Sequence, residues 1–211
     1  MRAFLVLTVI LGLVYPLTMT GVAQVLFPDR ADGSLVETSD GVVGSELIGQ
    51  SFTRPVTEDG EPVQDAAGLP VMAPDPAYFQ SRPSAAGAGY DPLSSSASNY
   101  GPENDELIAL IEARRGAVAE LDGVDGTQIS PHALLASGSG LDPHISPEYA
   151  AQQVERVAAA RGIEPADVRR LVEEHTAGRA LGFLGEPTVN VLLLNLALDE
   201  LTRPAEAADS E

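Results

Sequence analysis

The sequence has 211 residues and a formal net charge of −19, and all of its basic side chains are arginines. The absence of lysine excludes a Walker A phosphate loop, a Schiff base and a lysine general base within this chain. The absence of cysteine excludes thiol nucleophiles, thiolate zinc sites and disulfides. So acidic a chain lacks the basic surface that nucleic-acid phosphates require. Two interpretations of the acidity stay open: solvation in a salty habitat, and a role toward a partner.

The N-terminal segment is uncharged from Ala3 to Phe27, and a bilayer core needs only about 20 helical residues to be spanned. Small residues at Gly21 and Ala23 also allow a cleaved secretory signal. The apolar run exceeds the roughly 7–15 residues of a signal core, which favours an uncleaved anchor at 1–28. Because Arg2 precedes the span, the positive-inside rule predicts a cytoplasmic N-terminus and an exported remainder, 29–211.

The stretch 29–102 is rich in glycine, proline, serine and aspartate, a composition typical of short strands and loops. Strand-like runs lie at 34–36 and 45–52. The prolines of 53–76 predict a surface loop. Residues 81–102 have the composition of a disordered segment, which contacts with the rest of the chain can nevertheless order.

The stretch 103–201 changes to helical patterns. Asn104 is placed to cap a first helix. Its predicted buried face contains Leu107, Ile111, Val118 and Leu121. Ser130 and Pro131 begin a shorter helix, which Gly138 is able to end.

Two further helices are predicted by proline at their first turns. Ser146-Pro147 begins one that ends at Gly162 and buries Val154 and Val157. Pro165 begins another that extends to Gly178. Its apolar face contains Val168, Leu171, Val172 and His175. We expect His175 to be a packed histidine whose ring forms a hydrogen bond.

The last helix is predicted to begin at Pro187, in "PTVNVLLLNLALDEL". Its apolar run is too short and too polar to span a membrane, so it predicts a buried core helix. The expected fold class is α+β: a single N-terminal transmembrane helix followed by one exported soluble domain, with helices mainly in the C-terminal half. Residues 202–211 are expected to form a flexible acidic tail.

The loop "SGSGLDPHIS", 137–146, is the candidate functional site, and three interpretations stay open. Gly138 and Gly140 permit left-handed backbone, so that amides converge on an anion. A metal is the second option, with ligands drawn from Asp142, His144 and His132. The third and favoured interpretation is a connection between two helices. Ser137, Asp142 and His144 lie too close in sequence to indicate a catalytic triad.

Five blocks in order give the chain a resemblance to a known family. They are "VYPLTMTGVAQVLFP" (14–28), "GSELIGQSF" (44–52), "YFQSRPSA" (78–85) with "SNYGPENDEL" (98–107), "LLASGSGLDPHISPEYAAQQVERVAAARG" (134–162) and "GFLGEPTVNVLLLNLALDEL" (182–201). With these blocks the chain resembles the KdpC family, the C subunits of bacterial Kdp potassium-transporting ATPases. The sequence departs from the family at "SSSASNYGP", which the family has richer in glycine, and in the longer 53–76 loop.

The resemblance implies an accessory subunit with no catalytic residues, no metal and no cofactor of its own. The implied partners are a channel-like potassium-binding subunit, a P-type ATPase subunit and a small single-helix subunit in the inner membrane. Potassium is the implied transported ion. The family is described as a catalytic chaperone that raises the ATP affinity of the ATPase subunit. In the family, contact with nucleotide is attributed to a loop that corresponds in this chain to Ser137, Gly138, Ser139 and Gly140.

That nucleotide contact conflicts with the topology predicted from Arg2, which places the loop outside the cell and ATP inside it. An acidic exported domain would instead concentrate cations near a potassium entrance. The alternative function is an independent exported binding protein or enzyme that uses the loop 137–146.

Overall fold

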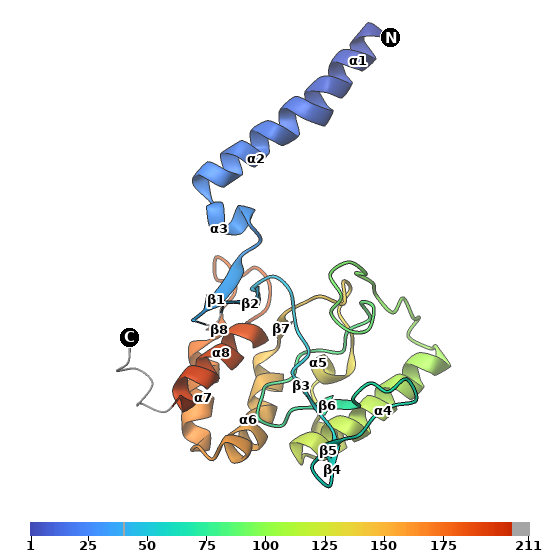
Figure 1. Ribbon diagram of the computed structural model, residues 1–211, viewed down its shortest axis with the longest axis vertical. Helices are drawn as coiled ribbons and strands as arrows, with labels where there is room; N and C mark the ends of the chain where they lie inside the picture. The colour runs from blue at the N-terminus through green and yellow to red at the C-terminus, as the bar shows by residue number, and fades with distance from the viewer. Residues whose placement is uncertain (40, 204–211) are drawn as a thin grey trace. The chain divides into compact units, whose positions relative to one another are not determined.

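The computed structural model describes residues 1–39 and 41–203. The chain divides into two compact units, Met1–Leu47 and Ile48–Glu211 (Figure 1). The predicted domain division, with an anchor at 1–28, stays a prediction. Most of the expected acidic tail, 204–211, lies outside the described residues.

The N-terminal unit begins with the apolar helix expected from the sequence. It runs as α1 (Arg2–Val9), a π-helical turn η1 (Ile10–Val14) and α2 (Tyr15–Leu26). Pro16 follows the π turn in the first turn of α2, and proline removes one helical hydrogen bond and crowds the preceding turn. The helix Arg2–Leu26 has a mean hydropathy of 2.1 and is long enough to cross a membrane.

The rest of this unit is a short helix and a two-stranded ladder. Helix α3 (Pro28–Ala31) leads to β1 (Leu35–Thr38), which pairs antiparallel with β2 (Gly41–Ser45). The predicted strand at 34–36 is therefore found, shifted toward the C-terminus. The predicted strand at 45–52 is wrong, because β2 ends at Ser45.

The second unit begins with irregular chain whose hydrogen bonds are made to loops. Gly49 donates its amide to the Leu141 carbonyl at 2.9 Å. The Gln50 carbonyl accepts a hydrogen bond from the Ser81 hydroxyl at 3.0 Å. Gly49 and Gln50 thus bond to loops rather than to a neighbouring strand, so this part of 45–52 does not form a strand.

The stretch predicted as a proline-held surface loop contains two short antiparallel ladders instead. β3 (Thr53–Pro55) pairs with β6 (Met72–Pro74), and β4 (Thr57–Glu58) pairs with β5 (Glu61–Pro62). Each proline lies at the end of its strand, where the missing amide interrupts the ladder least. The prediction of an exposed segment is confirmed for the strand residues, nearly all of which are exposed.

The helices begin where capping residues predict them. Asn104 accepts hydrogen bonds from the amides of Glu106 and Leu107 at the start of α4 (Asp105–Asp122). Ser146 accepts from the Tyr149 amide at the start of α6 (Pro147–Arg161). The helix α6 ends at Gly162, whose left-handed backbone confirms the predicted stop.

Two predicted helix ends are wrong. A 3-10 turn η2 (Gly126–Gln128) precedes α5 (Pro131–Leu134), which ends four residues before Gly138. The helix α7 (Pro165–Glu174) ends before Gly178, because the chain there enters β8 (Thr176–Ala177). The glycines are compatible with helix ends, but strand pairing and loop contacts terminate these helices earlier.

The C-terminal helix also begins later than Pro187. Residues 188–190 form β9 (Thr188–Asn190), the central strand of a sheet with order β7-β9-β8, in which β7 is His144–Ile145. Helix α8 (Val191–Thr202) follows, and Asn190 caps it by accepting from the Leu193 amide at 3.2 Å. Pairing on both sides of β9 takes these residues out of the helix.

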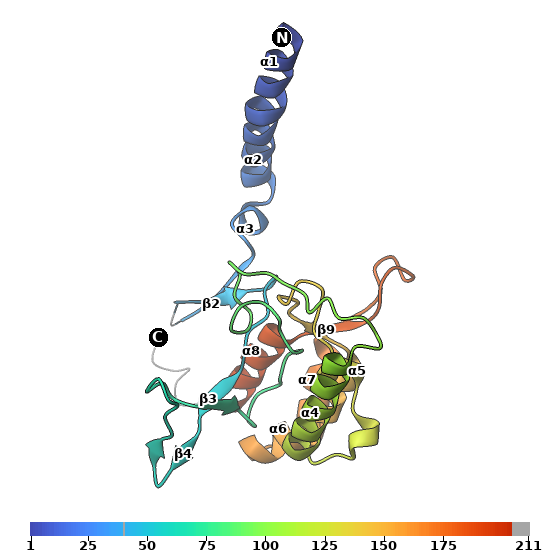
Figure 2. The ribbon, with the colours of Figure 1, turned by 90° about the vertical axis from the view of Figure 1, so that its right-hand side faces the viewer.

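The hydrophobic core lies among α6, α7, α8 and the three-stranded sheet, and Figures 1 and 2 show these three helices close to one another. The prediction of α8 as a buried core helix is confirmed, since Leu194 and Leu198 are fully buried. Val154 and Val157 are buried as predicted. The remaining core side chains include Phe79, Ile145, Tyr149, Val168, Val172 and Val189.

The apolar face of α4 packs less deeply. Its predicted residues Leu107, Ile111, Val118 and Leu121 are half-buried. The expectation for His175 is confirmed: its ring Nδ1 lies 2.9 Å from the Leu171 carbonyl. The observed architecture is therefore a mixed helix-and-strand fold, as predicted, together with one N-terminal apolar helix.

Candidate functional site

The loop 137–146 connects α5 to β7 and α6, and its own side chains satisfy much of its backbone. Ser137 is buried, and its hydroxyl accepts a hydrogen bond from the Gly140 amide at 2.9 Å. The exposed Ser139 hydroxyl accepts from the Leu141 amide at 3.1 Å. Both serines thus act as turn-forming residues.

The two glycines of the loop differ. Gly140 has φ +69°, and its Cα lies so close to Ala86 and Ser96 that an added methyl carbon would approach backbone atoms of each at 2.7 Å. Gly138 has no neighbour within that reach, and its φ is outside the left-handed region. The predicted left-handed geometry is therefore present at Gly140 and absent at Gly138.

The segment 81–102, which has a disordered composition, is held against this loop by contacts. The Ser84 hydroxyl donates to the Gly140 carbonyl at 2.6 Å and accepts from the amides of Ala86 and Tyr90. The Ser96 amide donates to the Ser139 carbonyl at 3.0 Å. The loop is thereby part of a larger interlocked structure.

The charged residues of this structure are also paired internally. Arg82 donates to the Asp142 carboxylate at 3.2 Å and to the carbonyls of Leu135 and Ala136. The other Asp142 oxygen accepts from the His144 amide at 3.0 Å and lies 3.2 Å from its ring Nδ1. Burial acts to raise the pKa of Asp142, but the hydrogen bonds from His144 and the charge of Arg82 outweigh it and lower the pKa.

These contacts bear on the metal interpretation. Asp142 and His144 are adjacent, but in the described stretches of the chain no group of three His, Cys, Asp or Glu side chains could hold a metal ion. His132 contributes a buried Nδ1 that has no hydrogen-bond partner among the described residues. It lines a cavity of about 490 Å³ together with residues of the α6 N-terminus and of the segment 186–188.

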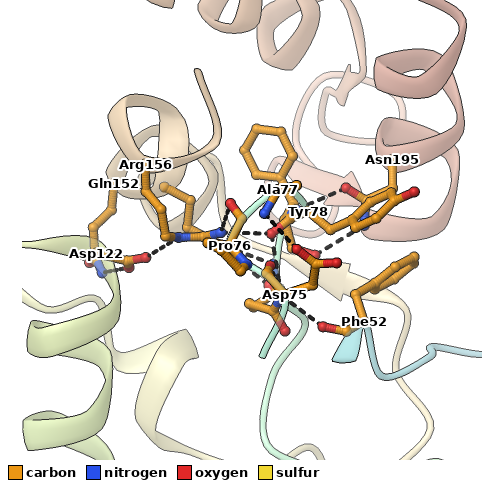
Figure 3. Close-up of polar contacts among 12 residues, drawn as sticks. Phe52, Asp75, Pro76, Ala77, Tyr78, Asp122, Gln152, Arg156 and Asn195 are labelled. Atoms are coloured by element: carbon orange, nitrogen blue, oxygen red, sulfur yellow. Dashed lines mark hydrogen bonds and ion pairs between the residues drawn. The ribbon is translucent and has the colours of Figure 1, made fainter. Parts of the chain in front are cut away.

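A second polar cluster, which the sequence did not reveal, fixes the segment that carries Arg82 (Figure 3). Arg156 on α6 pairs with Asp122 at 2.7 Å and donates to the carbonyls of Pro76 and Tyr78. The Asn195 side chain of α8 accepts from the Phe79 amide at 2.9 Å and donates to its carbonyl at 3.0 Å.

Gln153 completes the cluster by bonding both the amide and the carbonyl of Gln80. The signal for this cluster was Arg156 itself, which lies between the buried Val154 and Val157 on α6. An arginine on a buried helical face needs partners that accept its hydrogens. The turn at 76–78, before Arg82, supplies these acceptors through the carbonyls of Pro76 and Tyr78.

The structure thus combines a helix, Arg2–Leu26, that is long and apolar enough to cross a membrane with a loop whose polar groups bond to one another and to 81–102. The family described as "KdpC: K+-transporting ATPase, c chain" matches residues 1–200. The chain belongs to this KdpC family, subunits of the potassium-transporting ATPase.

Its relatives are named as the same subunit. A "Potassium-transporting ATPase KdpC subunit" of Kineococcus radiotolerans is 55% identical over 194 residues, 92% of this chain and 88% of the relative. The subunit of Streptomyces coelicolor is 46% identical over 97% of this chain and 92% of the relative. The subunit of Beijerinckia indica is 45% identical over 93% of this chain and 89% of the relative. The resemblance found in the five sequence blocks is thus confirmed.

Proposed function

We propose that this chain supports ATP-driven potassium uptake as a non-catalytic accessory subunit. In this proposal the N-terminal segment 1–28 anchors the chain in the cell membrane with a cytoplasmic N-terminus, and residues 29–211 lie outside. Support comes from the family match over 1–200, the apolar length of the helix and the charge of Arg2 before it. The proposed partners are the channel-like subunit, the P-type ATPase subunit and the small single-helix subunit.

The observation that carries the non-catalytic role is the internal pairing of the loop 137–146. Gly140 is packed against backbone, and the Asp142 carboxylate is occupied by Arg82 and His144. These contacts hold the loop and the chain around it in one shape, which fits a subunit that acts through its contacts.

The nucleotide contact implied for Ser137, Gly138, Ser139 and Gly140 stays a prediction. Ser137 and Gly140 are buried, so only Gly138 and Ser139 present exposed surface to a ligand. With the second unit outside the membrane, ATP would not reach either residue. A raised ATP affinity of the ATPase subunit, the proposed chaperone effect, would then be transmitted through contacts between subunits.

The independent exported binding protein or enzyme is not favoured, because the family match covers the anchor, the loop and α8 together. Ser139→Ala in the assembled transporter tests whether the loop 137–146 contacts nucleotide or acts only through its shape. The variant removes an exposed hydroxyl whose one described role is to accept from the Leu141 amide. We expect unchanged complex yield and an unchanged ATP concentration for half-maximal potassium-stimulated hydrolysis. A raised ATP requirement in an intact complex would contradict the proposal and support nucleotide contact.

A further inference from the structure

The chain between β8 and β9 forms a hairpin that the loop, the core and the polar cluster do not use. In residues 179–186, here called the apolar hairpin, Ala180 and Leu184 exchange two backbone hydrogen bonds of 2.9 Å. Figure 2 shows the chain that leads into β9 extending away from the helices of its unit. The hairpin is therefore a defined element that projects from the fold.

The tip of the apolar hairpin presents large apolar side chains to solvent. Leu181 is 84% exposed, Phe183 is 71% exposed and Leu184 is 50% exposed. Contiguous exposed apolar surface of this kind marks interaction sites in soluble domains. An aromatic side chain beside leucine is also typical of the anchors that fill a partner's pocket.

The backbone of the tip argues against a merely local role for these side chains. Leu181 has φ +53° and is followed by Gly182 at φ +83°. Left-handed backbone is costly for leucine, and glycine or asparagine would form the same turn with less strain. A leucine held in this conformation and left in solvent does not stabilise the hairpin, so its side chain serves something outside it.

Charge selects among the surfaces that could receive this tip. Within the hairpin, Arg179 pairs with Glu186 at 2.7 Å, so the tip carries no excess positive charge. The whole chain has a net charge of −19, which opposes both an anionic lipid surface and a second copy of the chain.

The base of the hairpin adds a complementary feature. Glu186 and Pro187 line the cavity of about 490 Å³, and Glu148 of α6 also lines it. Glu186 already pairs with Arg179, so Glu148 is the carboxylate that would face a basic side chain at the rim of a partner's apolar pocket.

We propose that the apolar hairpin inserts Leu181 and Phe183 into an apolar pocket on another subunit of the potassium-transporting ATPase. The cavity at its base would receive a basic side chain from the rim of that pocket. The inference rests on membership of the accessory-subunit family and adds the surface through which the subunit assembles.

The chain contains no cysteine, so single-cysteine variants report each position separately. Phe183→Cys is compared with Leu93→Cys, since Leu93 is 96% exposed and lies in a different loop. Each full-length variant is treated with N-ethylmaleimide as a purified chain in detergent, alone in phosphatidylcholine–phosphatidylglycerol vesicles, and in the assembled transporter. Modification is read from the mass of this chain, so cysteines of other subunits do not interfere.

We expect Phe183→Cys to react roughly tenfold more slowly in the transporter than in the isolated chain or the vesicles, while Leu93→Cys reacts equally in all three. Equal reactivity of Phe183→Cys in transporter and isolated chain would overturn the proposal. Protection already in vesicles without partners would also overturn it and assign the tip to the membrane.

A loss-of-contact variant separates this proposal from the proposed function. Leu181→Ser with Phe183→Ser should reduce recovery of the other subunits about tenfold on purification through a tag on this chain, whereas Leu93→Ser should not. Full recovery with the double variant contradicts docking through the hairpin and leaves the accessory role intact. Failure of the unaltered chain to recover any transporter subunit would instead refute the proposed function.

Discussion

Asp122 on α4 accepts a 2.7 Å hydrogen bond from Arg156 on α6, and their side chains are only 1% and 5% exposed. Arg156 also donates to the Pro76 and Tyr78 carbonyls, so one guanidinium joins two helices to the turn at 76–78 that precedes Arg82. Charges buried this deeply are tolerated only when nearly every hydrogen has an acceptor. The geometry of the loop 137–146 therefore depends on an ion pair that lies outside it.

Asp122→Ala should destabilise the protein by about 3–5 kcal/mol, because it leaves the Arg156 charge buried without its counter-ion. Urea unfolding of the full-length chain in detergent, followed by circular dichroism, measures the change. Glu155→Ala is the matched control, since Glu155 pairs with Arg169 at 3.2 Å on the exposed side of α6. Its expected cost is below about 1 kcal/mol, and similar costs for both variants would contradict the role of the buried pair.

Leu194→Ala should cost about 2–5 kcal/mol, because Leu194 is fully buried between α8 and the rest of the core. Leu193, the neighbouring residue, is only half-buried, so Leu193→Ala should cost clearly less. Thermal unfolding of both variants in the full-length chain gives the comparison. A larger effect at Leu193 would mean that α8 presents its other face to the core.

Helix starts could be read from the sequence because their causes are local. Asn104 and Ser146 cap α4 and α6 with their own side chains, and Gly162 ends α6 by its left-handed backbone. These effects act within a few residues of the helix end. The apolar helix Arg2–Leu26 could also be predicted from the sequence, because the length of its uncharged run is sufficient for the prediction.

The strands and the polar cluster could not be predicted from the sequence, because they depend on contacts between residues that are far apart in the chain. Residues 188–190 continue the apolar pattern of α8, and only pairing with β7 and β8 makes them a strand. The contact of Arg156 with Pro76 joins residues 80 positions apart. For the loop 137–146, the sequence allowed the interpretation as a connection between two helices. It did not show that Ala86 and Ser96 pack against Gly140.

The stability of the second unit should fall below about pH 6.5 through His132. Burial and the charge of Arg82 lower its pKa from 6.5, while Asp142 and Glu148 act in the opposite direction. The unfolded chain thus binds a proton at a higher pH than the folded chain. The stability from neutral His132 is present above the unfolded pKa and is lost as the pH decreases through it.

His132→Asn removes this titration and keeps a polar side chain. Between about pH 7.5 and about pH 5.5, the unfolding midpoint should decrease more for the unaltered chain than for the variant. Other titrating groups contribute equally to the pH dependence of both proteins. The difference between their decreases in unfolding midpoint therefore reports the protonation of His132 alone. Parallel decreases would show that its protonation is not linked to folding.

Protease added to intact spheroplasts should digest the second unit and leave the N-terminal helix in the membrane. The expectation follows from Arg2 at the short end of the uncharged span. A cytoplasmic marker protein must survive in the same sample. Digestion of the unit only after lysis would reverse the proposed orientation and place the loop 137–146 on the same side as ATP.

Gly140→Ala should destabilise the protein by about 1–3 kcal/mol, whereas Gly138→Ala should change stability by less than about 0.5 kcal/mol. At Gly140 the methyl group must adopt φ +69° and would approach the Ala86 nitrogen and the Ser96 carbonyl oxygen at 2.7 Å, so backbone has to move. At Gly138 the same methyl group enters open space. Thermal unfolding compares them directly, because the two substitutions add the same atoms two residues apart. Equal small effects would mean that 81–102 leaves the loop readily, and the loop would then lose the fixed shape on which its architectural role depends.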